Sequence, residues 1–163
     1  SGVLRVAKQI VTSEYIWDNI RLKGGAYGGG CGFLNGNYFY MYSYRDPNVN
    51  KSYEVFKNVG NYLSEIDMDQ KHLNRFIIGA VNVEDAPLKN NRINSIVLRR
   101  HYNGVTQERL DLRREEMLSV SINDIREVGQ ELTTAMENIV MSTVSDQTSI
   151  EKSELFKNII VVK

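Results

Sequence analysis

Apolar residues at the start of the chain recur at the spacing of an amphipathic helix. They are Val3, Leu4, Val6, Ala7, Ile10 and Val11, followed by Tyr15, Ile16, Trp17 and Ile20. Because residues three and four apart share one helix face, this pattern predicts a helix from about Val3 to about Asn19. Five glycines between Gly24 and Gly30 then end the helical pattern.

The next segment has the pattern of a β-hairpin. Residues 26–34 and 37–45 predict two strands on either side of Asn35-Gly36-Asn37. Asn-Gly favours a tight hairpin turn because both residues tolerate positive φ. The second strand is aromatic along most of its length, which is typical of a strand that is covered on both faces.

The rest of the chain is mainly helical in pattern. Apolar spacing predicts helices over residues 53–63, 73–81 and 93–101, one that begins at Thr106, and one from the capping box of Ser121 and Asp124 to about Glu137. Asn103-Gly104 is a typical helix end. Strands are expected at 139–144 and 158–163, with a short helix between 145 and 155. This order predicts one α+β domain over residues 1–163, with a mainly antiparallel sheet covered by helices.

Composition argues against several functional classes. Lys+Arg and Asp+Glu both number 20, so there is no bulk charge that would attract nucleic acid or an anionic membrane. No apolar run approaches the roughly 20 residues that span a bilayer. One cysteine excludes a disulfide within the chain. The chain has no signal-peptide pattern and begins directly in a helical one, which suggests a piece excised from a longer protein.

The titratable residues do not form a zinc motif. A zinc site requires three or four nitrogen, sulfur or oxygen ligands in tetrahedral reach. His72 and His101 lie in neither a His-x-x-Glu-His nor a His-Glu-x-x-His pattern, and Cys31 is far from both in sequence. Cys31 is flanked by glycines without a nearby base, so we expect a structural small residue and no nucleophile. No metal ligand is therefore assigned in this chain.

The glycine-rich segment from Lys23 to Gly32 could be mistaken for a phosphate-binding loop. It lacks the Gly-Lys-Ser/Thr ending of a P-loop and the strand-first order of a dinucleotide loop. It follows a helix and enters a strand, so no helix N-terminus faces an anion. A flexible turn with a strand poor in side chains is the simpler interpretation, and such a strand permits close approach of a ligand or another backbone.

Arg21 and Tyr27 flank this turn and are the candidate functional pair. Arginine offers a fixed fork of donors for carbonyl or carboxylate oxygens, and tyrosine offers one hydroxyl on a rigid ring. A glycine turn can bring two side chains six residues apart to one side. The pair could then bind a peptide carbonyl or a developing oxyanion.

The segment Arg21-Leu22-Lys23-Gly24-Gly25-Ala26-Tyr27-Gly28 resembles the Arg-x-x-Gly-Gly-Ala-Tyr-Gly signature of presequence proteases, which are pitrilysin/insulinase-type zinc metallopeptidases. Ser43-Tyr44-Arg45-Asp46-Pro47-Asn48 is similar to the segment after the next strand in the same family. Residues 77–79, 85–87 and 113–118 before Asp124 give weaker support.

The resemblance implies a C-terminal domain without the zinc site, in a clamshell of two homologous halves. It implies that Arg21 and Tyr27 contact an unfolded peptide beside zinc held by the N-terminal half, and that Tyr27 helps to bind the oxyanion. Gly24, Gly25 and Gly28 would shape the loop. The isolated domain would be inactive, because catalysis needs a water activated by the metal. A bacterial cytoplasm is the default location, and an organelle matrix is the alternative.

Two other functions remain open on the sequence. The chain could belong to a non-catalytic structural or recognition homologue of the same fold, which a whole protein without a zinc motif would favour. It could also be a small-ligand or nucleotide-binding module built on the glycine loop, which a calorimetric titration with nucleotides would test.

Overall fold

The computed structural model describes residues 1–34 and 38–161. Its first half contains a long helix, a hairpin and two short helices: α1 (Gly2–Ile10), the π-helical η1 (Val11–Leu22), β1 (Gly28–Leu34), β2 (Tyr38–Tyr44), α2 (Val49–Lys57) and α3 (Val59–Ser64). The second half is helical: α4 (Gln70–Glu84), α5 (Asn90–Tyr102), α6 (Gln107–Leu118), α7 (Ile122–Ala135), the 3-10 turn η2 (Met136–Asn138) and α8 (Gln147–Ser153).

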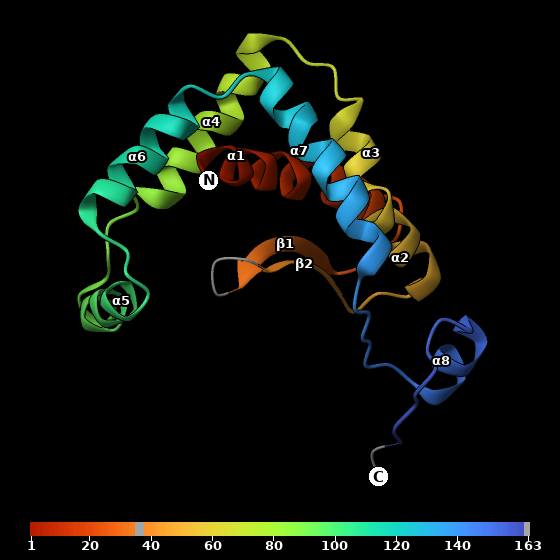
Figure 1. Ribbon diagram of the computed structural model, residues 1–163. Helices are drawn as coiled ribbons and strands as arrows, with labels where there is room; N and C mark the ends of the chain where they lie inside the picture. Colours follow the sequence, from red (N-terminus) through yellow and green to blue (C-terminus); the bar gives the residue numbers. More distant parts are fainter. Residues whose placement is uncertain (35–37, 162–163) are drawn as a thin grey trace.

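The first helix lies at the centre of the molecule. α1 continues into η1 without a break, because Ile10 and Val11 both have right-handed helical backbone. Val6, Ile10 and Ile16 are fully buried. The hairpin packs on one side of this helix and α4, α6 and α7 pack on the other, which gives three layers (Figure 1). The predicted helix is therefore present, one turn longer than expected and π-helical over its second half.

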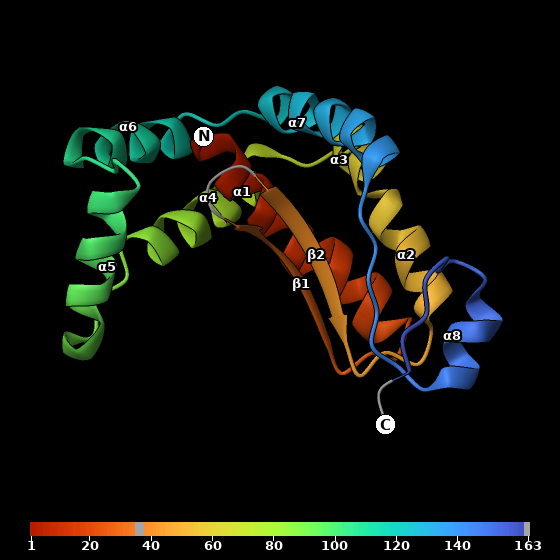
Figure 2. The same ribbon diagram turned by 60° about the horizontal axis from the view of Figure 1, so that its bottom comes forward.

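The hairpin has one covered face and one open face (Figure 2). β1 and β2 pair antiparallel, with Gly28 opposite Tyr44 and Phe33 opposite Phe39. Phe39, Met41 and Ser43 are half-buried, and the intervening tyrosines are exposed. The expectation that both faces of the second strand are covered is wrong for the described residues, because helices cover only one of them. The turn at 35–37 lies outside the described residues.

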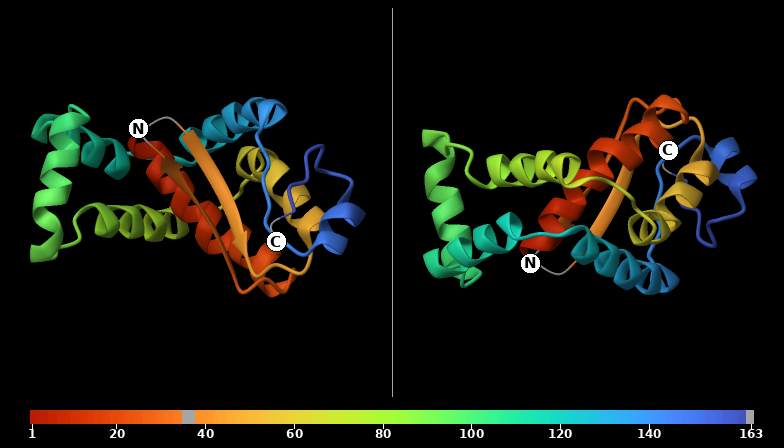
Figure 3. Two further views of the ribbon diagram at one scale, coloured as in Figure 1. Left: turned by 90° about the horizontal axis from the view of Figure 1, so that it is seen from below. Right: turned by 90° about the horizontal axis from the view of Figure 1, so that it is seen from above.

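The helical layer follows the predicted caps. Thr106 accepts a hydrogen bond from the backbone nitrogen of Arg109, and Ser121 with Asp124 forms the expected capping box that begins α7. The single helix predicted over 53–63 is two helices, α2 and α3, because the helix is interrupted at Asn58, which ends the first and begins the second. Figure 3 shows that α5 lies across the C-terminal end of α4 and the N-terminal end of α6, and none of its residues is buried.

The two strands expected at 139–144 and 158–163 are not formed over the described residues, and residues 162–163 lie outside them. Residues 139–144 and 158–161 are irregular, and the short helix expected between them is α8. Val140 and Val144 are fully exposed. A strand is stable only when it pairs and packs, and among the described residues β1 pairs with β2 alone, so residues of high β-propensity remain extended without a partner. The sheet is thus a two-stranded hairpin, and the fold is α+β with mostly helix.

Candidate functional site

The turn between η1 and β1 is closely packed at its first glycine and left-handed at its second. A Cβ at Gly24 would lie 2.4 Å from the carbonyl oxygen of Ile20, and Gly25 has φ of 77°. The Gly25 nitrogen donates to the Arg21 oxygen at 3.0 Å, and the Ala26 nitrogen donates to the Ile20 oxygen at 3.1 Å. These bonds satisfy carbonyls that the helix end would leave open, so the helix reverses directly into the strand.

The segment that follows β2 supports this turn from the other side. Asn48 donates from Nδ2 to the Gly24 oxygen at 2.8 Å. Asp46 accepts from the Asn48 nitrogen at 2.8 Å through Oδ1, and Ser52 donates to its other oxygen. The segment Arg45–Asn48, called the clamp below, therefore fixes the glycine turn. The Asp-Pro-Asn sequence signals a strand end, but no spacing rule connects it to Gly24.

Arg21 and Tyr27 are both exposed beside this turn, and their side chains have different partners. The Arg21 guanidinium lies over the ring of Trp17, 4.2 Å from its centroid. Tyr27 is 66% exposed, and its ring contacts Tyr44 edge to face at 6.0 Å between centroids. The turn thus places a guanidinium at the end of the helix and a phenol at the start of the strand, both open to solvent.

The open face of the hairpin is lined by tyrosines. Tyr40 and Tyr42 lie opposite Gly32 and Gly30, and their rings cover these glycines so closely that a Cβ there would meet them at 2.7 and 3.0 Å. Gly28 differs, because a Cβ there would meet nothing within 4 Å. At Gly30 and Gly32 the space left by the missing side chains is thus filled by tyrosine rings of β2, whereas Gly28, next to Tyr27, stays open.

Cys31 has a structural environment. It is buried, lies 3.2 Å from Thr12 Oγ1 and contacts the Lys8 carbonyl. Burial raises the pKa of its thiol above the ordinary value, which opposes formation of the nucleophilic thiolate.

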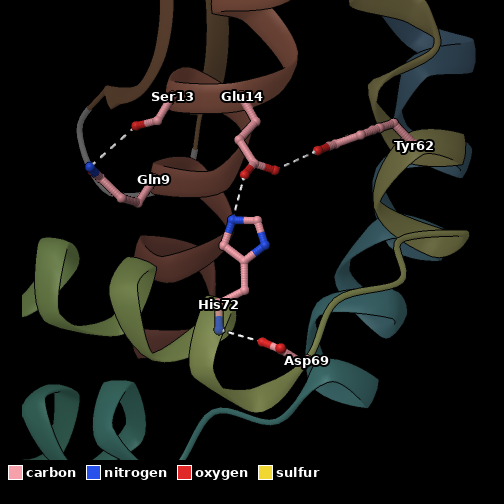
Figure 4. A network of polar contacts seen from close by, with 6 residues as sticks. All are labelled: Gln9, Ser13, Glu14, Tyr62, Asp69 and His72. Atoms are coloured by element: carbon pink, nitrogen blue, oxygen red, sulfur yellow. Dashed lines mark hydrogen bonds and ion pairs between the residues drawn. The ribbon is translucent and has the colours of Figure 1, made fainter.

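His72 belongs to a polar network that joins three helices (Figure 4). Its Nε2 lies 2.7 Å from Glu14 Oε1, and the Tyr62 hydroxyl donates to the other oxygen of Glu14 at 3.2 Å. Burial and the nearby Glu14 carboxylate raise the pKa of Tyr62, so its phenol stays protonated and can donate. Asp69 caps α4 by accepting from the His72 nitrogen at 2.7 Å. This network fastens η1 to α3 and α4.

The described residues do not match a metal centre or a phosphate loop. Over residues 1–34 and 38–161, no three His, Cys, Asp or Glu residues gather as metal ligands. The glycine segment follows the C-terminus of η1, so its amides do not form a helix N-terminus. No helix in the described part of the chain is long and apolar enough to cross a bilayer.

The arrangement defines a helix-backed α+β domain with an exposed Arg–Tyr pair on a glycine turn. The chain belongs to the PreP C-terminal domain family, whose model matches residues 1–147. It is 32% identical over 163 residues to presequence protease 1, chloroplastic/mitochondrial, of Arabidopsis thaliana, covering 96% of this chain and 15% of that protein.

Two further relatives give the same result. Mitochondrial presequence protease of Kluyveromyces lactis is 35% identical over 131 residues, covering 78% of this chain and 13% of that protein. Protein HypA of Clostridium perfringens is 29% identical over 160 residues, covering 98% of this chain and 16% of that protein. The chain thus spans about a sixth of the length of the curated relatives it matches. The resemblance to presequence proteases is confirmed.

Proposed function

We propose that this chain is the substrate-binding domain of a zinc-dependent endopeptidase that degrades unfolded peptides. The observation that carries the proposal is the exposed pair Arg21 and Tyr27 on a turn fixed by the clamp, in a chain of the PreP C-terminal domain family. Relatives named as presequence proteases support a peptide substrate.

The two side chains supply complementary donors to a peptide backbone. Arg21 offers a planar fork to a carbonyl oxygen, and its partner in this structure is the exposed ring of Trp17, an exchangeable contact. Tyr27 donates one hydrogen bond from its hydroxyl to the carbonyl under attack, and this bond strengthens as negative charge develops on the oxygen. Gly24 and Gly25 shape the turn, and the open space at Gly28 admits the peptide beside Tyr27.

The zinc of such an enzyme does not fit the residues that the structure describes. His72 is held by Glu14, and no third ligand joins them among the described residues. Zinc is therefore assigned to an N-terminal half of a longer polypeptide, which is the partner of this domain, and the isolated domain is expected to be inactive. The location that fits the relatives is an organelle matrix, with a bacterial cytoplasm as the alternative.

The test is substitution in the longer, zinc-containing polypeptide. Arg21→Ala and Tyr27→Phe are each expected to lower kcat about 100-fold, the usual cost of losing one preorganised donor, with zinc content unchanged. Tyr38→Phe, at an exposed tyrosine of the same hairpin, serves as the matched control and should retain full turnover. Full turnover in both site variants would remove the assigned roles.

The same polypeptide tests the non-catalytic alternative. A whole protein that contains this domain, binds peptide and holds no zinc would be a recognition homologue. Bound zinc and peptide cleavage that stops on chelation would establish the peptidase.

A further inference from the structure

Arg45 has a backbone conformation that side chains rarely adopt. It follows the last residue of β2 and has φ of 47°, in the left-handed region that favours glycine. Non-glycine residues remain in this region where the surrounding structure holds them, often at functional sites. The conformation therefore raises the question of what Arg45 contacts.

Both the backbone and the side chain of Arg45 contact Tyr27. The Tyr27 nitrogen donates to the carbonyl oxygens of Tyr44 and Arg45, at 3.1 and 3.3 Å. The Arg45 guanidinium lies 5.7 Å from the centroid of the Tyr27 ring and 5.5 Å from that of Tyr44. These distances are within the range of cation–π attraction. Arg45 thus shares the main-chain nitrogen of Tyr27 with Tyr44 and adds a cation beside the Tyr27 ring, which Tyr44 contacts edge to face.

The neighbouring carboxylate does not compete for this guanidinium. Both oxygens of Asp46 are engaged, one by the Asn48 nitrogen and the other by the Ser52 hydroxyl. Among the ion pairs of the described residues, none involves Arg45. The positive charge is therefore directed at the two tyrosine rings.

We propose that Arg45 is a positioning residue that aims the Tyr27 hydroxyl at the bound peptide. This inference rests on the proposed role of Tyr27 and adds the residue that makes its direction reproducible. An exposed phenol without such a contact would rotate about its χ angles, and the hydroxyl would meet the substrate oxygen in only a fraction of encounters.

A double-mutant cycle in the zinc-containing polypeptide separates positioning from other roles. Arg45→Gly removes the guanidinium and suits the left-handed backbone, so the turn is retained. It is expected to lower kcat about threefold to tenfold with little change in KM. Arg45→Lys, which keeps the charge without the planar fork, should recover part of this loss. In a Tyr27→Phe background, Arg45→Gly should cause almost no further loss, because both changes remove the same interaction.

The outcomes distinguish this inference from the proposed function. If Arg45→Gly causes an equal loss in both backgrounds, the positioning role of Arg45 is overturned while the proposed role of Tyr27 is kept. Full activity of Arg45→Gly would have the same meaning. No loss from Tyr27→Phe would overturn the function itself. A fluorine resonance from 3-fluorotyrosine at position 27 gives a readout without turnover: it should move in Arg45→Gly and stay fixed in Lys51→Ala, at an exposed helix position. A resonance unmoved by Arg45→Gly would contradict the contact.

Discussion

The side-chain amide of Asn48 is hydrogen-bonded to the backbone carbonyl of Gly24, with 2.8 Å between nitrogen and oxygen. The two residues are 24 positions apart and lie on either side of the hairpin. The bond therefore joins the end of the first helix to the segment after the second strand. Arg21 and Tyr27 therefore flank a turn that is fixed from both sides.

Asn48→Ala should loosen this turn. The variant leaves the Gly24 carbonyl without its partly buried partner, so we expect a loss of about 1 kcal/mol in the free energy of unfolding. Hydrogen exchange of the Gly25 and Ala26 amides should also become faster. Urea unfolding and native-state exchange measure the two effects. Gln70→Ala, which removes an exposed bond to Asn74, is the control and should change neither quantity appreciably.

Alanine at Gly24 and at Gly28 should have opposite effects. Gly24→Ala places a Cβ against the Ile20 carbonyl and is expected to cost about 2 kcal/mol of stability. Gly28→Ala meets nothing in the fold and should leave stability unchanged or raise it by up to about 1 kcal/mol. If peptide approaches at this position, the added methyl should still weaken binding about threefold.

Thermal unfolding and the fluorescence anisotropy of a labelled, unstructured peptide measure this pair of variants. Unchanged affinity in Gly28→Ala would place the peptide elsewhere on the domain. A Gly24→Ala variant as stable as the parent would show that the turn can open without cost.

The sequence was sufficient for elements whose signals are local. Helical spacing gave the first helix, and the side chains of Thr106, Ser121 and Asp124 marked helix starts that the structure shows. Asn103 ends α5, and Gly104 takes a positive φ of 60° there. Each of these signals depends on residues within one or two turns of each other, so it is readable without knowledge of the fold.

Features that depend on distant partners were missed or wrongly predicted. Val140 and Val144 have strand propensity, but a strand forms only with a neighbour to pair with. The tyrosines of β2 looked like a buried strand because an aromatic run does not reveal how many faces are covered. The glycine motif predicts Arg21 and Tyr27 as the candidate pair. The contact of Arg45 with Tyr27 joins residues 18 positions apart, and it depends on the strand register that pairs their neighbours Gly28 and Tyr44.

The ion pair between Glu84 and Arg113 should make stability depend on pH. It joins α4 to α6 at 2.6 Å with both side chains largely covered. Burial disfavours the charged carboxylate, but the hydrogen bond from Arg113 and nearby arginine charges outweigh it, so the pKa of Glu84 lies below its ordinary value. A lowered folded-state pKa stabilises the fold above the unfolded-state pKa, and this contribution disappears as the pH falls through the folded-state value.

Glu84→Gln is therefore expected to lower the free energy of unfolding by about 1–2 kcal/mol at pH 7. The difference from the parent should shrink as the pH falls below about 4.5, the ordinary pKa of glutamate. Urea unfolding at several pH values measures it. Asp18→Asn, which breaks the more exposed pair with Lys23, should cost less than about 0.5 kcal/mol. A difference that grows on acidification would mean that folding raises the pKa of Glu84, contrary to this prediction.

Trp17 should report when Arg21 engages a peptide. It is the only tryptophan of the chain, it is 45% exposed, and the Arg21 guanidinium lies over its ring. If Arg21 turns to a peptide carbonyl, the indole loses this cover, and its quenching by acrylamide should increase as peptide is added. The titration should follow the same binding curve as the anisotropy of a labelled peptide.

Arg21→Ala supplies the matched control for this reporter. Its indole is uncovered from the start, so quenching should already be high without peptide and should not rise when peptide binds. Residual binding in this variant is expected to be weaker by about tenfold or more, the loss of one hydrogen bond from a charged donor. Quenching that stays constant in the parent while labelled peptide saturates would show that Arg21 remains on Trp17, and the peptide would then be held without the guanidinium.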